Sequence, residues 1–146
     1  MIYAADRAHH VYSLIRPALE AGTVVITDRY LDSSIAYQGA GRVLQPSEVA
    51  RISRWATEQL TPTLTIILDL PAEVGIGRLT SRDRLESEPL DFHERVRNEF
   101  LNLARVDPDR YVVVDAQQSV EAIQEAIRER VAALPLLKIN KTDKKA

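Results

Sequence analysis

An acidic residue and an arginine, Asp28 and Arg29, stand directly after a short apolar run, Thr23–Thr27 (TVVIT). Such a run predicts a buried strand, and ligands of parallel α/β sheets bind at the carboxyl ends of the strands. A carboxylate there can hold Mg²⁺ through water, and a guanidinium can neutralise phosphate charge. The pair therefore suits phosphoryl transfer, although a salt bridge at a strand end is the simpler interpretation of these two residues alone.

Hydroxyl and amide side chains follow the pair within the segment DRYLDSSIAYQGAGR (28–42). A helix that begins near Tyr30 would place Ser34, Tyr37 and Gln38 on one face, because residues three and four apart are neighbours on a helix. These groups could read a sugar and a base edge.

A second candidate segment is MIYAADRAHH (1–10), which contains Tyr3 and Arg7. Aromatic stacking together with the fork of an arginine is a sound way to hold a nucleotide. The alternative is that Tyr3 is a core aromatic and that Arg7 belongs to a surface ion pair with Asp6.

The elements that must position these residues alternate between strand and helix. Strands are expected at Thr23–Thr27, Leu64–Asp69 and Tyr111–Asp115, each covered on both faces because none alternates apolar with polar residues. Helices are expected over 4–21, stopped by Gly22, over 46–60, from Pro71 onward, and over 120–133 with Ser119 as the N-cap. This order predicts an α/β doubly wound fold with a parallel sheet and flanking helices.

Three segments resemble those of bacterial thymidylate kinases. DRYLDSSIAYQG resembles the family's DR(Y/H) block, MIYAADRAHH its LFAADRAQH block, and GRLTSRDRLESEPLDFHERVRNEFL (77–101) its lid and the following helix. The resemblance implies a fold like that of the P-loop nucleoside monophosphate kinases. It also implies that thymidylate is held by Tyr3, Arg7, Ser34, Tyr37 and Gln38.

The same resemblance assigns the phosphoryl-transfer machinery. Asp28 would position Mg²⁺, and Arg29 with the lid residues Arg82 and Arg84 would stabilise the transferring phosphoryl group. Arg78 is assigned to ATP, as are Ala116 and Gln117 in VVVDAQQSVEAI. The alternative for the third segment is a solvated charged helix, and its lid is shorter than the family pattern.

The family's phosphate loop, GxxGxGK[ST], does not occur in this sequence. In the family its strand lies at the centre of the sheet, between the strand that ends in DRY and the strand equivalent to Leu64–Asp69. Without it, a gap of about 10 Å is expected between these two strands, since neighbouring strands lie ~4.8 Å apart. The expectation is a domain over 1–133 that lacks its central strand and is at most marginally stable alone.

Composition adds broad limits. A net charge of -2 gives no general attraction to nucleic acid or membranes, and the absence of cysteine excludes disulfides and thiolate metal sites. A cytoplasmic location and a flexible basic tail over 134–146 are expected, and the resemblance to thymidylate kinases implies a homodimer. Two alternatives to thymidylate phosphorylation remain open: an inactive, thymidylate-binding remnant, and a phosphotransferase similar to the deoxynucleoside kinases.

Overall fold

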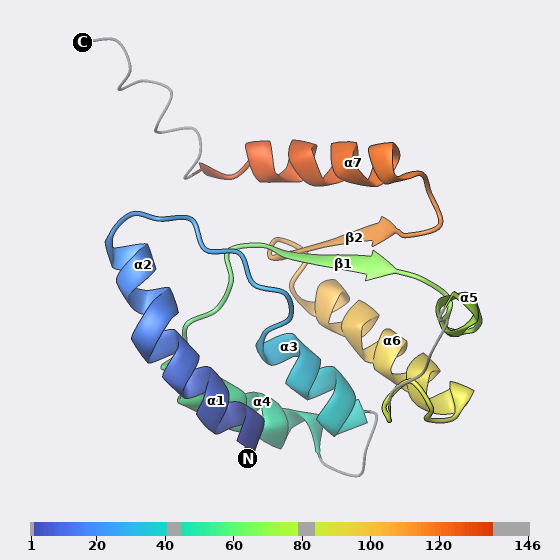
Figure 1. Cartoon of the computed structure of the whole chain (residues 1–146), viewed down its shortest axis with the longest axis horizontal. Helices are drawn as coiled ribbons and strands as arrows, with labels where there is room; N and C mark the ends of the chain where they lie inside the picture. The colour runs from blue at the N-terminus through green and yellow to red at the C-terminus, as the bar shows by residue number, and fades with distance from the viewer. Residues whose placement is uncertain (1, 41–44, 79–83, 136–146) are drawn as a thin grey trace. The chain divides into compact units, whose positions relative to one another are not determined.

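The computed structural model describes residues 2–40, 45–78 and 84–135. The chain divides into two units, of which the first comprises 1–61 and 88–103 and the second comprises 62–87 and 104–146. Figure 1 identifies the elements along the chain. None of the described helices combines the length and the apolar character needed to cross a bilayer.

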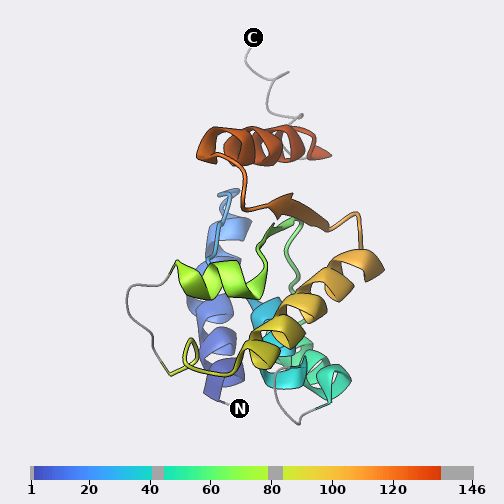
Figure 2. The same ribbon diagram turned by 90° about the vertical axis from the view of Figure 1, so that its right-hand side faces the viewer.

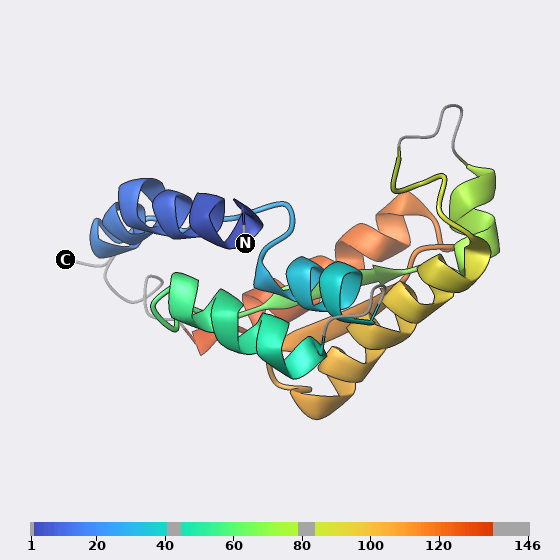
Figure 3. The same ribbon diagram turned by 90° about the horizontal axis from the view of Figure 1, so that it is seen from below.

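Unit 1 is helical. Its first helical segment runs without a break through α1 (Ile2–His10), a π-helix η1 (Val11–Ile15) and α2 (Arg16–Glu20). It ends as expected at Gly22, whose φ of 76° places it in the left-handed region that favours glycine. Figure 3 shows α1 beside α4 (Pro46–Ala56), which it contacts.

The short helix α3 (Leu31–Ser34) follows Tyr30, where a helix start was expected, and continues as a second π-helix, η2 (Ile35–Ala40). The core beneath it is formed by Leu31, Ile35 and Val49. Tyr30, Ala50 and Leu103 pack against these three side chains, so that α3, η2, α4 and the helix α6 (Leu90–Val106) share one apolar cluster.

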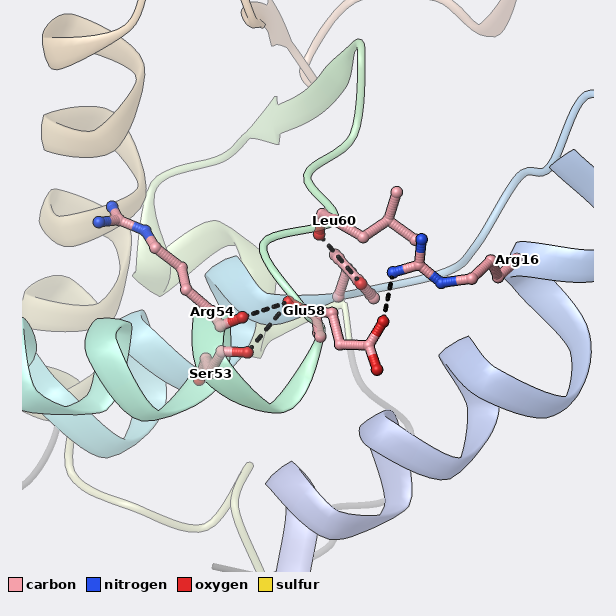
Figure 4. A network of polar contacts seen from close by, with 7 residues as sticks. Arg16, Ser53, Arg54, Glu58 and Leu60 are labelled. Carbon is pink, nitrogen blue, oxygen red and sulfur yellow. Dashed lines mark hydrogen bonds and ion pairs between the residues drawn. The ribbon is translucent and has the colours of Figure 1, made fainter. Parts of the chain in front are cut away.

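The C-terminal end of α4 is closed by a polar network (Figure 4). Thr57, which is fully buried, donates its hydroxyl to the carbonyl oxygens of Ser53 and Arg54 at 3.1 and 3.2 Å. Helix α4 ends at Ala56, earlier than the expected limit of residue 60. The helix cannot continue further because Glu58 and Gln59 have positive φ angles of 50° and 61°.

Unit 2 contains two parallel strands, β1 (Thr65–Asp69) and β2 (Tyr111–Asp115), in the register Thr65↔Tyr111 to Asp69↔Asp115. Two of the three expected strands are thus confirmed, the first of them beginning at Thr65 instead of Leu64. Helix α5 (Ala72–Gly77) follows β1, and α7 (Val120–Ala132) covers one face of the pair (Figure 2). Ser119 caps α7 as expected, accepting a hydrogen bond from the Ala122 N–H at 3.2 Å.

Two expectations about the strands are wrong. Thr23–Thr27 has no regular secondary structure, and Val24 and Ile26 are 70% and 90% exposed. A strand needs a neighbour that accepts its backbone hydrogen bonds, and among the described residues the only ladder is that between β1 and β2. Nor is the described sheet covered on both faces, because burial alternates along β1 and Leu68 is 55% exposed.

Candidate nucleotide site

The residues assigned to the acceptor nucleotide all belong to unit 1, and those assigned to the donor nucleotide that are described belong to unit 2. Arg82 lies outside the described residues, as does the C-terminal segment from residue 136 onward.

The centre of the acceptor group is Arg7, a half-buried residue of α1. One terminal nitrogen, Nη2, donates to the Ser34 hydroxyl at 2.9 Å. The other, Nη1, is buried and has no hydrogen-bond partner among the described residues. A buried guanidinium with an unpaired donor is costly to maintain, and an anionic group is the partner that would satisfy it best.

The charges around Arg7 also favour an anionic ligand. Burial lowers the pKa of the Arg7 guanidinium, an effect that Tyr30, Asp6 and Asp32 oppose in that order. Asp32 is itself only 4% exposed and lies in the first turn of α3, where negative charge is favoured. The corner is thus a low-dielectric one in which charge interactions are stronger than in water.

Tyr30 forms one wall of this corner. The Arg7 guanidinium lies 5.7 Å from the centroid of its ring. The Tyr30 hydroxyl donates to the Leu60 carbonyl oxygen at 3.2 Å, and burial raises the pKa of this phenol. The sequence alone did not indicate a role for Tyr30, although this residue directly follows Asp28 and Arg29.

Tyr3, which the resemblance assigns to the thymine ring, is 62% exposed on α1. It is therefore not a core aromatic, and the alternative interpretation of this side chain is wrong. Its ring is free of aromatic neighbours within the described contacts, so a planar ligand could stack on it.

Ser34, Tyr37 and Gln38 were expected on one face of an α-helix. Ser34 ends α3, whereas Tyr37 and Gln38 lie in the π-helix Ile35–Ala40, in which hydrogen bonds run to the fifth residue. Ser34 is buried and contacts Arg7, while Tyr37 contacts Arg29 and the rings of Phe92 and Phe100. Gln38 is half-buried.

Asp28 and Arg29 are both exposed in the turn that leads into α3. Arg29 has a φ of 63°, a left-handed conformation that costs a residue with a side chain roughly 1–2 kcal/mol. Its guanidinium carbon lies 5.2 Å from the centroid of the Tyr37 ring. Strained backbone of this kind is concentrated at functional sites.

A metal could draw on few protein ligands here. Across the described residues, acidic and histidine side chains do not gather in groups of three or more. Mg²⁺ needs only one or two carboxylates when substrate phosphates and water complete its shell, so the single exposed carboxylate of Asp28 fits that ion better than an all-protein site.

In unit 2, the donor-group residues follow the carboxyl ends of β1 and β2. The Arg78 guanidinium donates to the Ala116 carbonyl oxygen at 3.4 Å, and the Gln117 N–H donates to the Asp115 carboxylate at 2.8 Å. The Ala116 N–H is bound to the Asp69 carbonyl oxygen at 2.8 Å. The structure thus brings Arg78, Ala116 and Gln117 together, and Arg84 is exposed in the turn before α6.

A parallel strand pair joined through helices is typical of the α/β class, and the family that this chain matches has the fold of the P-loop nucleoside monophosphate kinases. Within that class, residues 1–127 match the family model described as thymidylate kinase. The chain belongs to the thymidylate kinase family.

Curated relatives agree with this assignment. The chain is 56% identical over 138 residues to a thymidylate kinase of Clavibacter michiganensis, which covers 92% of this chain and 65% of that relative. It is 49% identical over 134 residues to a thymidylate kinase of Cutibacterium acnes, covering 92% of this chain and 66% of the relative. The chain therefore spans just under two thirds of the length of these relatives.

Proposed function

We propose that unit 1 binds thymidylate and that the chain supplies the acceptor side of thymidylate phosphorylation. The observation that carries the proposal is the half-buried Arg7, with one terminal nitrogen bound to Ser34 and the other buried without a partner among the described residues. A nucleotide phosphate or base edge would complete its hydrogen bonds. Membership of the family supports thymidylate as the nucleotide.

In the reaction proposed, an oxygen of the thymidylate phosphate attacks the γ-phosphorus of ATP. The bond from that phosphorus to the β,γ-bridging oxygen breaks, which leaves ADP and thymidine diphosphate.

Three arginines, Arg29, Arg82 and Arg84, would stabilise negative charge on the oxygens of the transferring phosphoryl group. Asp28 would hold the Mg²⁺ ion, whose chemistry is to neutralise phosphate charge. Arg78, Ala116 and Gln117 are proposed to contact ATP, while Tyr3, Tyr37 and Gln38 complete the thymidylate site.

The first test is titration calorimetry of the intact chain with thymidylate, thymidine and cytidine monophosphate. Thymidylate should bind most tightly, and Arg7→Gln should weaken its binding by about tenfold or more, since hydrogen bonds to charged groups contribute ~1.5–3 kcal/mol. Arg51→Gln, which changes an exposed arginine of α4, is the matched control and should bind like the unchanged chain. Absence of thymidylate binding by the unchanged chain would overturn the proposal.

A measurement of turnover distinguishes a thymidylate kinase from a protein that only binds thymidylate. The second candidate is a thymidylate-binding protein without kinase activity, since residues 1–146 do not include GxxGxGK[ST]. A coupled assay of ADP release with ATP, Mg²⁺ and thymidylate distinguishes them. Replacing thymidylate by thymidine in the same assay tests for a deoxynucleoside kinase.

A homodimer located in the cytoplasm is also proposed, by similarity to the family. Exposed apolar side chains of the first helical segment, among them Ile2 and Tyr12, support a contact with another protein surface. Sedimentation equilibrium over a range of protein concentrations tests the oligomeric state.

A further inference from the structure

The Tyr37 ring is held by side chains from two other parts of unit 1. Its centroid lies 6.2 Å from that of Phe92 and 6.3 Å from that of Phe100, with the ring planes inclined by 57° and 76°. The Arg29 guanidinium carbon lies 5.2 Å from the Tyr37 centroid. Tilted and edge-to-face rings at such distances attract one another, as does a cation over a ring.

Phe92 and Phe100, here called the α6 phenyl pair, are well placed to act together. They are separated by about two turns of one helix and so project from the same side of α6. Phe92 is only 3% exposed, and its ring is packed edge-on against His93 at 5.4 Å. The pair is therefore a firmer support than an exposed side chain could provide.

Tyr37 needs such support because of where it lies in the chain. It belongs to the π-helix η2, and π-helical turns are rare and usually short. The contacts of the Tyr37 ring with Phe92 and Phe100 add side-chain support to this segment.

We propose that the α6 phenyl pair positions Tyr37 within the thymidylate site and so sets the affinity of unit 1 for the acceptor nucleotide. This inference rests on the proposed function. Phe92 and Phe100 act through Tyr37 and are therefore positioning residues. If the Tyr37 ring is released, only a fraction of the molecules present its hydroxyl correctly, and the apparent affinity falls by that fraction.

The test is a double-mutant cycle between Phe92→Leu and Tyr37→Phe in the intact chain, with thymidylate binding as the readout. Tyr37→Phe removes the hydroxyl but keeps the ring against the phenyl pair. Phe92→Leu should weaken thymidylate binding by about fivefold when the hydroxyl is present, and by less than about twofold when it is absent. If Phe92→Leu does not fold, the half-buried Phe100→Leu completes the same cycle.

The control is Val96→Ala, which removes buried volume from the same helix without removing an aromatic ring. It should lower stability and leave thymidylate affinity within about twofold of the unchanged chain. An equal loss of affinity for Phe92→Leu with and without the Tyr37 hydroxyl would show a merely structural effect and overturn the inference. Failure of the unchanged chain to bind thymidylate overturns the proposed function and this inference together, whereas binding without coupling overturns the inference alone.

Discussion

The Arg7 guanidinium and the Ser34 hydroxyl, from helices separated by the whole of Thr23–Thr27, meet at 2.9 Å. The contact uses one terminal nitrogen of Arg7 and orients the other, which is buried without a partner among the described residues. Ser34 is itself 7% exposed, so water cannot easily replace Arg7 as the hydrogen-bond partner of its hydroxyl. This hydrogen bond connects the first helical segment to α3. It also orients the positively charged Arg7 guanidinium, which we propose binds the nucleotide.

Ser34→Ala should therefore weaken thymidylate binding by about tenfold, because the hydrogen bond that orients Arg7 is lost and a second buried donor is left unpaired. The neighbouring Ser33→Ala removes a half-buried hydroxyl of the same helix and should bind thymidylate like the unchanged chain. Calorimetric titration of both variants measures the difference. Equal affinities for the two variants would contradict the role assigned to Ser34.

Backbone strain after α4 gives a prediction about stability. Gln59 has a φ of 61°, and its N–H donates to the Arg54 carbonyl oxygen at 2.8 Å. Glycine adopts this conformation without the steric cost that other residues carry, so Gln59→Gly should raise the free energy of unfolding by up to about 1 kcal/mol. Urea denaturation followed by circular dichroism measures the change.

The same substitution within a regular helix should have the opposite sign. Gln124 lies inside α7 and is exposed, and Gln124→Gly should lower the free energy of unfolding by about 1 kcal/mol. A loss of stability for Gln59→Gly as well would show that the positive φ angle carries no strain at this position.

Features set by local chemistry were predictable from the sequence. Gly22 ends the first helical segment because glycine accepts a positive φ, and Ser119 begins α7 because its hydroxyl can accept a backbone hydrogen bond. The runs that become β1 and β2 were recognised because each is rich in β-branched residues.

Features set by distant partners were not predictable. Thr23–Thr27 has the composition of a buried strand, but composition does not supply the neighbouring strand that a ladder requires. The π-helical spacing around Tyr37 was likewise not expected, and the ring of Tyr37 contacts Phe92 and Phe100, which are far away in the sequence. The sequence thus supplied candidate side chains for the site, but not the helix type that sets their relative directions.

Hydrogen exchange should reveal the boundary at the start of Thr23–Thr27. The Thr23 N–H donates to the Ala18 carbonyl oxygen at 2.9 Å and should exchange slowly. The N–H groups of Val24 and Ile26, which are exposed and lie outside regular secondary structure, should exchange at nearly the rate of an unfolded peptide. The Thr65 N–H, bound to the Arg110 carbonyl oxygen at 2.8 Å, is the reference for a protected strand. Slow exchange at Val24 and Ile26 would restore the strand that the sequence suggested.

Glu99, on α6, makes stability depend on pH. Burial raises the pKa of its carboxyl above the unfolded value of about 4.3, so the folded chain favours the protonated form. This contribution to stability is fully present below the unfolded pKa and is lost as the pH rises through the folded pKa. Glu99→Gln, which stays neutral, should therefore be more stable than the unchanged chain at pH 7, and the difference should shrink towards pH 4.

The control is Glu125→Gln, which removes an exposed carboxylate 3.9 Å from Arg128. It should leave stability at pH 7 unchanged or lower it. Urea midpoints at the two pH values measure both variants, and a Glu99→Gln variant less stable than the unchanged chain at pH 7 would show that the Glu99 carboxylate is stabilised rather than opposed by its surroundings.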